Sequence, residues 1–116
     1  MAEPYVENLS AMIDRLELSV DKVGQLECRH FFSGAALYAN GKICASLTPA
    51  GFGLKLPAEA RMQLIETIDG TELRYFENAP VKNDYVALSK RVLQDDEWLR
   101  SLLLNSIEFV TGERFR

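Results

Sequence analysis

Residues 29–47, Arg-His-Phe-Phe-Ser-Gly-Ala-Ala-Leu-Tyr-Ala-Asn-Gly-Lys-Ile-Cys-Ala-Ser-Leu, contain the strongest local structural signal in the chain. Asn40 and Gly41 lie between two runs, 35–39 and 42–48, that suit β-strands. Both central residues of a type I′ turn need positive φ, which Asn and Gly tolerate best. The pattern therefore predicts a β-hairpin centred on this pair.

The segments on either side of the hairpin have a similar character. Residues 27–32 form an extended run that leads to Gly34, and a glycine inside a strand pattern indicates a bulge or a sharp bend. A second turn is expected at residues 48–51. It is followed by residues 52–56, whose apolar side chains alternate as in a half-buried antiparallel strand. Four neighbouring β segments predict a meander.

A helix is predicted before the meander, over about residues 4–23. Its apolar residues recur at intervals of three and four and form one narrow stripe: Val6, Leu9, Ile13, Leu16, Val20 and Val23. Pro4 suits the first helical turn, and Gly24 stands where a left-handed C-cap is expected. We expect this stripe to pack on the sheet of the same domain.

The middle of the chain predicts a short helix and a strand pair. Pro57 can begin a helix that runs to about residue 66, with Met62 and Ile65 turned inward. Residues 72–76 have the pattern of a strand, and residues 84–88 have that of its partner.

A last helix is predicted after a short turn that Ser89 caps. Asp95 or Asp96 caps this helix at its start, and it runs to about Thr111, where Gly112 can end it. Its apolar residues spread well beyond one stripe: Trp98, Leu99, Leu102, Leu103, Leu104, Ile107, Phe109 and Val110. So wide an apolar arc predicts burial on more than one side, against the sheet and against a partner or the first helix.

These elements predict an α+β fold. We expect two layers, with helices packed on an antiparallel sheet of five to six strands, in the order α-β-β-β-β-α-β-β-α. A chain of 116 residues is expected to form a single domain over residues 1–116.

Composition excludes some classes of function. No apolar run approaches the ~20 residues of a membrane helix, and the first residues lack the pattern of a signal peptide. With two cysteines, the chain is expected to be cytoplasmic and to have no membrane partner. A net charge of −4 disfavours direct nucleic-acid binding as the main activity.

The cysteines and the single histidine give no catalytic group. In a plain two-residue hairpin Cys44 lies opposite Leu37 and far from Cys28, so the two thiols are poorly placed to form a disulfide. We interpret both as buried structural thiols, with a redox or metal role as the alternative. His30 is interpreted as a half-buried structural residue, with a general base as the alternative.

Other polar segments have structural explanations too. The acids at 95–97 suit a helix N-terminus better than a metal site. The glycines at 33–34 and 51–53 match no phosphate-binding loop. We therefore expect no catalytic residue, no cofactor and no metal, and no enzymatic activity.

One pattern favours nucleic acid as an alternative ligand. An aromatic and basic sheet face is typical of proteins that bind single strands. The residues that can share such a face are Arg29, Lys42, Lys55 and Lys82, with Phe31, Tyr38 or Tyr75.

Residues 29–38, the turn 40–42 and Ala45 together resemble the N-terminal domain of the TfoX (Sxy) family of competence regulators. That family shows an arginine, a Met-Phe-Gly-Gly-like segment, a tyrosine, an Asp/Asn-Gly-Lys turn and a strand with alanine. A later Leu-x-Leu-Lys-like strand is matched by residues 52–56. Tyr75 and Tyr85 are candidates for the family's tyrosine-bearing strand pair. The resemblance extends over about residues 5–111.

The sequence departs from the family pattern at three positions. Phe31 replaces the usual methionine, Ser33 the first glycine and Ala36 a frequent later glycine. Because Ser and Ala do not readily adopt positive φ, the bend is expected to rest on Gly34 alone. The second, C-terminal domain of the family's full-length regulators is not expected in this chain.

The resemblance implies an α+β fold without known catalytic residues and a role in regulating natural transformation genes, alongside the catabolite-activator protein. We expect a non-enzymatic regulatory module that binds a protein partner, with the transcription machinery as one source of that partner. A homodimer through the first or last helix is also expected. The alternatives are a nucleic-acid-binding module and a small ligand-binding or enzymatic domain.

The candidate site residues follow from the resemblance and from the last helix. The family-motif residues, with a structural or partner-binding role, are Arg29, Phe32, Gly34, Tyr38, Gly41, Lys42, Lys55 and Tyr85. The candidate partner surface of the last helix contains Trp98 and Leu104.

Overall fold

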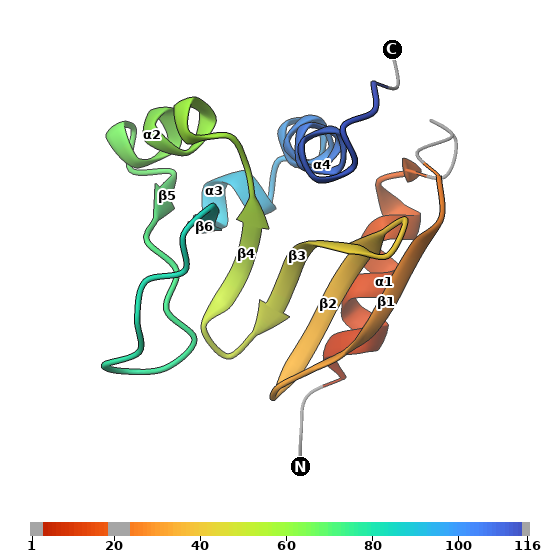
Figure 1. Cartoon of the computed structure of the whole chain (residues 1–116), viewed down its shortest axis with the longest axis horizontal. Helices are drawn as coiled ribbons and strands as arrows, with labels where there is room; N and C mark the ends of the chain where they lie inside the picture. The colour runs from red at the N-terminus through yellow and green to blue at the C-terminus, as the bar shows by residue number, and fades with distance from the viewer. Residues whose placement is uncertain (1–3, 19–23, 115–116) are drawn as a thin grey trace.

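The computed structural model describes residues 4–18 and 24–114 (Figure 1). Its helices are α1 (Tyr5–Arg15), α2 (Ala58–Glu66), α3 (Lys90–Leu93) and α4 (Asp96–Thr111). Its strands are β1 (Leu26–Phe31), β2 (Gly34–Ala39), β3 (Lys42–Thr48), β4 (Gly51–Lys55), β5 (Gly70–Thr71) and β6 (Tyr85–Leu88). The fold is α+β, and the elements follow the predicted order, with the expected turn after Ser89 forming α3.

The six strands form one antiparallel sheet in the order β1-β2-β3-β4-β6-β5, so β1 and β5 are its edges (Figure 1). One face of the sheet packs against α1 and α4. The core between these layers contains Leu9 of α1, Leu37 of β2, Leu54 of β4 and Leu103 of α4, all fully buried. The other face carries no helix of the described chain, and we call it the open face.

The first helix is shorter than predicted. Leu9 and Leu16 of the expected stripe are buried, but α1 ends at Arg15, because Glu17 adopts a φ of 55° that an α-helix does not allow. Val20 and Val23 lie outside the described residues. Gly24 is not a C-cap of α1. Its own positive φ falls just before β1, where a Cβ atom would lie 2.7 Å from Oδ1 of Asn40.

The predicted hairpin turn is confirmed, whereas its register is not. Asn40 and Gly41 have φ values of 51° and 82°, as a type I′ turn requires. The register then shifts by one residue, so that Leu37 lies opposite Ala45 instead of Cys44. Cys44 is the extra residue of a β-bulge and is buried in the core beside Ala45.

The inward face predicted for α2 is wrong. Met62 and Ile65 are 61% and 44% exposed, whereas Leu64 is buried and Ala60 packs against the core. The reason is that α2 packs only at the β5–β6 edge of the sheet, so one narrow stripe is enough to cover the contact.

Residues 72–76 do not form the predicted strand. The strand that pairs with β6 is β5, only two residues long, and the chain then crosses the open face before returning to β6. Leu73 is buried there against Gly53, where a Cβ atom would lie 2.5 Å from Cδ2 of Leu73. Lys82 donates its backbone N–H to the carbonyl of Leu73 at 2.8 Å, so this segment is held by its own hydrogen bonds.

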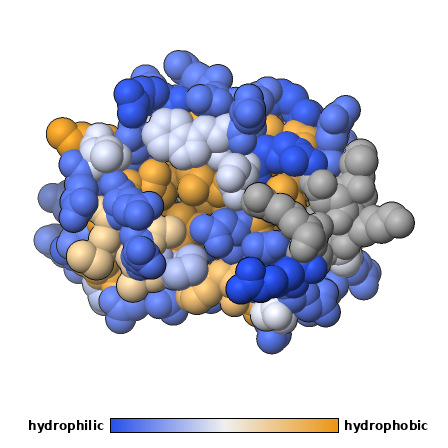
Figure 2. Space-filling view, turned by 90° about the horizontal axis from the view of Figure 1, so that it is seen from above, coloured by the Kyte–Doolittle hydropathy of each residue, from blue (hydrophilic) through white to orange (hydrophobic). Residues whose placement is uncertain are grey.

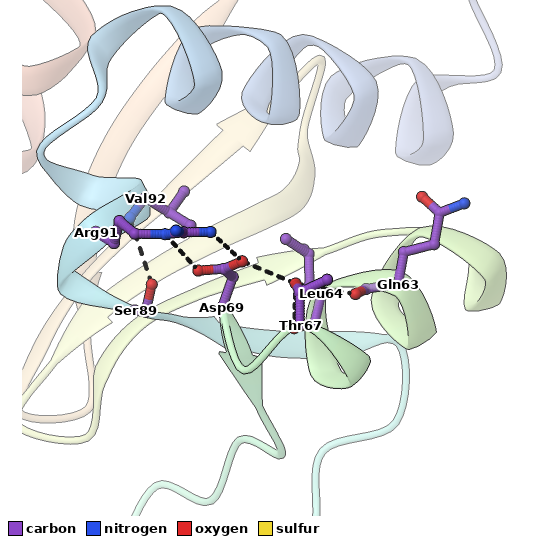
Figure 3. A network of polar contacts seen from close by, with 7 residues as sticks. All are labelled: Gln63, Leu64, Thr67, Asp69, Ser89, Arg91 and Val92. Carbon is purple, nitrogen blue, oxygen red and sulfur yellow. Dashed lines mark hydrogen bonds and ion pairs between the residues drawn. The ribbon is translucent and has the colours of Figure 1, made fainter.

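A polar network fixes the beginning and end of this excursion (Figure 3). The buried Asp69 accepts two hydrogen bonds from the guanidinium of Arg91, at 3.0 and 2.9 Å, and one from the hydroxyl of Thr67 at 2.8 Å. The Arg91 and Thr67 hydrogen bonds lower the pKa of Asp69. The network joins the end of α2 to α3.

The last helix matches its prediction closely. Asp95 caps it by accepting a hydrogen bond from the backbone N–H of Trp98, and Gly112 ends it with a φ of 75°. Leu99, Leu103 and Ile107 are fully buried under the sheet. Half of the wide apolar arc is therefore buried core, and three more of its residues pack against that core.

Candidate functional site: the open face of the sheet

Strand alternation brings the candidate residues to the open face. Leu37 and Ala39 of β2 point into the core, so Tyr38 between them points to the opposite side. Its register neighbour Glu27 lies on the same face, and so does Arg29 two residues further along β1. Lys55 and Tyr85 form a cross-strand pair on β4 and β6, also on this face.

An aromatic cluster is built around Tyr75. Its ring centroid lies 5.6 Å from that of Phe31, 5.8 Å from Phe32 and 6.4 Å from Tyr85. Its hydroxyl shares a hydrogen bond of 3.0 Å with the hydroxyl of Ser46 on β3. The segment after β5 thus places one ring where residues from β1, β3 and β6 meet.

Three cations lie over aromatic rings of this face. The Arg29 guanidinium is 4.7 Å from the ring centre of Tyr38, Lys55 Nζ is 5.4 Å from that of Tyr85, and Lys82 Nζ is 5.6 Å from that of Tyr75. Such contacts hold positive charge on an aromatic surface and each contribute about 0.5–1 kcal/mol where exposed. Arg29 also forms an ion pair with Glu27 at 2.6 Å.

Phe32 is the most unusual residue of the site. Its side chain is 79% exposed, and its backbone has a φ of 52°, which non-glycine residues rarely adopt. The bend was expected to rest on Gly34, but the positive φ falls on Phe32 instead. Gly34 is required for space, because a Cβ atom there would lie 2.2 Å from the carbonyl oxygen of Leu47.

An apolar groove of about 380 Å³ opens beside this turn. Phe76 at its margin is 70% exposed, so two large aromatic side chains face solvent at one site. The groove is lined by Phe32, Ser33, Thr48, Tyr75, Phe76, Ala79, Pro80 and Lys82. Contiguous exposed apolar surface of this kind marks binding sites in soluble proteins.

The structure brings together five of the eight predicted motif residues, gives the two glycines backbone roles and places Lys42 apart. Arg29, Phe32, Tyr38, Lys55 and Tyr85 share the open face. Gly41 is the hairpin turn, and the exposed Lys42 pairs with Ala39, on the side of the core. His30, expected to be half-buried, is exposed, because it lies at the rim of the edge strand β1.

Sequence reasoning did not assign Phe76 and Pro80 to a site. Phe76 was placed at the end of a strand, and Pro80 has no periodic pattern around it. The available signal was the clustering of Tyr75, Phe76 and Pro80 in a polar segment, where a packed core does not require apolar residues.

Burial raises the pKa of two thiols and one tyrosine at the sheet. Burial raises the pKa of the Cys44 thiol to about 12, and burial with the nearby Asp14 carboxylate raises that of Cys28. Burial and the neighbouring Tyr75 raise the pKa of Tyr85. Both cysteines are free, but Cys28 is only half-buried. Thiols with raised pKa values are weak nucleophiles at neutral pH.

The described residues form neither a metal-ligand cluster nor a membrane-spanning helix. Among residues 4–18 and 24–114, no three His, Cys, Asp or Glu side chains gather closely enough to hold a metal ion. No helix in this described part of the chain has the length and apolar character needed to cross a membrane.

The surface predicted on the last helix is smaller than expected. Leu104 is 6% exposed and belongs to the core, so it offers little to a partner, and the half-buried Trp98 is covered by the guanidinium of Arg91 at 5.5 Å. Figure 2 looks onto the side of the molecule with α2 and α4 and shows apolar surface between polar side chains. Exposed apolar residues of these helices are Met62, Ile65 and Phe109.

The fold and the site define a two-layer α+β domain with an exposed aromatic and basic sheet face. A comparison with family models matches residues 19–110 to the TfoX N-terminal domain. The chain belongs to this family, which supports a domain of regulatory type. The match begins after α1, although α1 packs on the same core. No individual curated protein is matched by the sequence.

Proposed function

We propose that this chain is a non-enzymatic regulatory module that binds a segment of a protein partner in the groove of the open face. The observation that carries the proposal is the exposure of Phe32 and Phe76 at one apolar groove. Leaving two large aromatic side chains in water is unfavourable, and a partner that covers them recovers this free energy.

The charge around the groove indicates the kind of segment it fits. Lys82 lines the groove and lies over Tyr75, so it presents positive charge beside an apolar surface. A segment that combines an apolar anchor with acidic residues matches both features. In keeping with the regulatory type of the family, we place the partner in the transcription machinery.

The absence of enzymatic activity is part of the proposal. It is supported by the raised pKa values of both thiols and by the exposure of His30. A nucleophile of raised pKa without an adjacent base is a poor catalyst at neutral pH.

The proposal is tested by crosslinked capture from the organism's own extract. Phe32→Ser combined with Phe76→Ser removes both anchors, and the matched control Ile68→Ser removes an 81% exposed apolar side chain that does not line the groove. We expect the groove variant to capture its partner more than ~10-fold less well, since anchors of this type contribute over ~1 kcal/mol each. Equal capture by wild type and both variants would refute the proposal.

Direct binding of single-stranded nucleic acid is the second candidate. The three cation–aromatic pairs of the open face favour it. Against it, the net charge is −4 and Arg29 is already paired with Glu27. Fluorescence anisotropy with a labelled oligonucleotide distinguishes the two, because nucleic-acid binding weakens steeply between ~50 and ~200 mM salt. No binding at the lower salt concentration excludes this candidate.

A further inference from the structure

Along its whole length, the edge strand β1 presents backbone groups that pair with no other strand of the described chain. Within the described residues β1 pairs only with β2. Phe31 and Gly34 flank a two-residue turn and form a hydrogen-bonded pair. Every second residue of β1 from Phe31 backwards is then hydrogen-bonded to β2. The hydrogen bond from the Asn40 N–H to the Gln25 carbonyl fits this alternation. The N–H and C=O groups of Leu26, Cys28 and His30 therefore point away from β2. An edge of six residues is a template for another strand.

The charges on β1 match those of a second copy of the same strand. Two β1 strands paired antiparallel about Cys28 place Glu27 of each copy opposite Arg29 of the other. Both side chains are about half exposed and lie on the open face, so opposite charges would meet twice. A shift of one or two residues removes this match, and the charge pattern therefore selects one register.

A groove beside β1 is a second feature that suits pairing with another copy of the chain. About 500 Å³ of space lies between α1 and the edge strand, and it is lined by Val6, Ser10, Ile13, Asp14, Gly24, Leu26, Glu27, Cys28 and Leu37. The helix α1 lies against both β1 and β2. Because α1 lies over β1 and β2 and strands are ~4.8 Å apart, pairing two β1 strands would bring the two α1 helices to roughly 10–15 Å, near enough for their side chains to meet across the axis.

From these observations we propose that two copies of this chain form a symmetric dimer by antiparallel pairing of their β1 strands, with the α1 helices packed across the two-fold axis. The dimer has one continuous sheet of twelve strands, twice the six of each chain. Both open faces look to the same side, so the dimer presents two grooves in one direction. This proposal does not depend on the identity of the groove's ligand.

Charge exchange on β1 tests the dimer directly. Light scattering is expected to give about 26 kDa for the wild type, twice the 13.1 kDa of the chain. Glu27→Arg places two arginines opposite each other, and Arg29→Glu does the same with two glutamates, so each variant is expected at the monomer mass. The double variant Glu27→Arg/Arg29→Glu restores both opposite pairs and is expected to recover the dimer. The control Glu66→Arg makes the same charge change on α2 and should leave the mass unchanged.

Two further measurements locate the interface. In the dimer, the amide protons of Leu26, Cys28 and His30 should exchange with solvent more slowly than in the Glu27→Arg monomer. Asp14 lines the groove between α1 and β1, close to Cys28, which lies on the two-fold axis of the dimer. The two Asp14 carboxylates of the dimer therefore repel each other, and Asp14→Asn is expected to tighten the dimer. A monomeric wild type at its highest soluble concentration overturns the proposal, and so does a dimer that Glu27→Arg leaves intact.

Discussion

Phe32 combines two features that cost folding free energy, an exposed aromatic ring and a left-handed backbone conformation. Strain of this kind costs about 1–3 kcal/mol and is enriched at functional sites. Its ring touches Phe31 and Tyr75, so the strained turn holds an aromatic surface in a fixed place. These features support the proposed role of Phe32 as an anchor for a partner.

Replacing Phe32 by glycine separates these roles. In Phe32→Gly the relieved strain offsets the lost ring contacts, and the free energy of unfolding in urea is expected to change by less than ~1 kcal/mol. Partner capture should nevertheless fall, because the anchor is gone. A variant that unfolds cooperatively at a much lower urea concentration would show that Phe32 serves the fold instead.

Gly34 behaves in the opposite way. An added Cβ meets the backbone of Leu47 and Thr48, which cannot move aside like a flexible side chain. We expect Gly34→Ala to lower the free energy of unfolding by about 1–3 kcal/mol or more, measured by urea titration. The neighbouring exposed Ser33→Ala is the control and should be close to wild type.

Among the elements, the segment between β5 and β6 supplies the least regular structure and most of the groove. It is anchored on the sheet by Leu73 over Gly53 and by the hydrogen bond between Tyr75 and Ser46. Leu73→Ala should cost about 2–4 kcal/mol of unfolding free energy, because a buried leucine leaves a cavity. The exposed Glu77→Ala in the same segment is the comparison, and an equally small effect of both would show that Leu73 is no anchor.

The Asp69 network makes the junction of α2 and α3 sensitive to pH. The folded-state pKa of Asp69 lies below its ordinary value of 3.8, so the ionised group stabilises the fold above that value. This contribution is lost as the pH falls through the folded-state pKa. Asp69→Asn should unfold more easily than wild type at neutral pH, and the two stability curves should converge below about pH 4.

A control for this pH dependence is Asp84→Asn. Asp84 pairs with Arg61 at 3.5 Å on the surface, where ion pairs contribute little. We expect it to follow the wild-type curve by thermal melting at each pH. Parallel curves for Asp69→Asn and wild type down to low pH would contradict the role of the network.

Regular elements could be predicted from sequence where local chemistry determines them. Asn40-Gly41 and the caps Asp95 and Gly112 require particular backbone angles, and these positions were correct. The inward orientation predicted for Met62 and Ile65 and the strand predicted at 72–76 were wrong, because the environment of these residues depends on which part of the sheet lies beside them. Local periodicity does not contain that information.

The candidate site also contains residues that the sequence indicates and residues that only the folded structure brings together. Arg29 and Tyr38 were candidates from the family resemblance and from the aromatic and basic sheet face weighed as an alternative, whereas the convergence of Phe32 with Tyr75 and Phe76 was not predicted. Phe32 is far along the chain from Tyr75 and Phe76, and it meets them only because the segment after β5 crosses the open face. The bulge at Cys44 was missed for a related reason, since nothing local distinguishes it from a regular strand.

At the level of the whole molecule, the two faces of the sheet differ in role. The face under α1 and α4 forms the core that stabilises the fold, and the open face is a surface exposed to solvent. The helices α1 and α4 cover the core, which leaves the open face free to carry aromatic rings and cations (Figure 1). Pairing through β1 would extend the sheet without covering either groove. We propose that the regulatory role that the family supports is carried by the open face.

The most direct test of this assignment is made in the organism itself. In a strain lacking the gene, the transcripts of DNA-uptake genes are measured after complementation with wild type, Phe32→Ser/Phe76→Ser or Ile68→Ser, at equal protein levels. We predict that wild type and Ile68→Ser restore the wild-type transcript levels, and that the groove variant resembles the deletion. Full restoration by the groove variant would contradict a regulatory role for the open face.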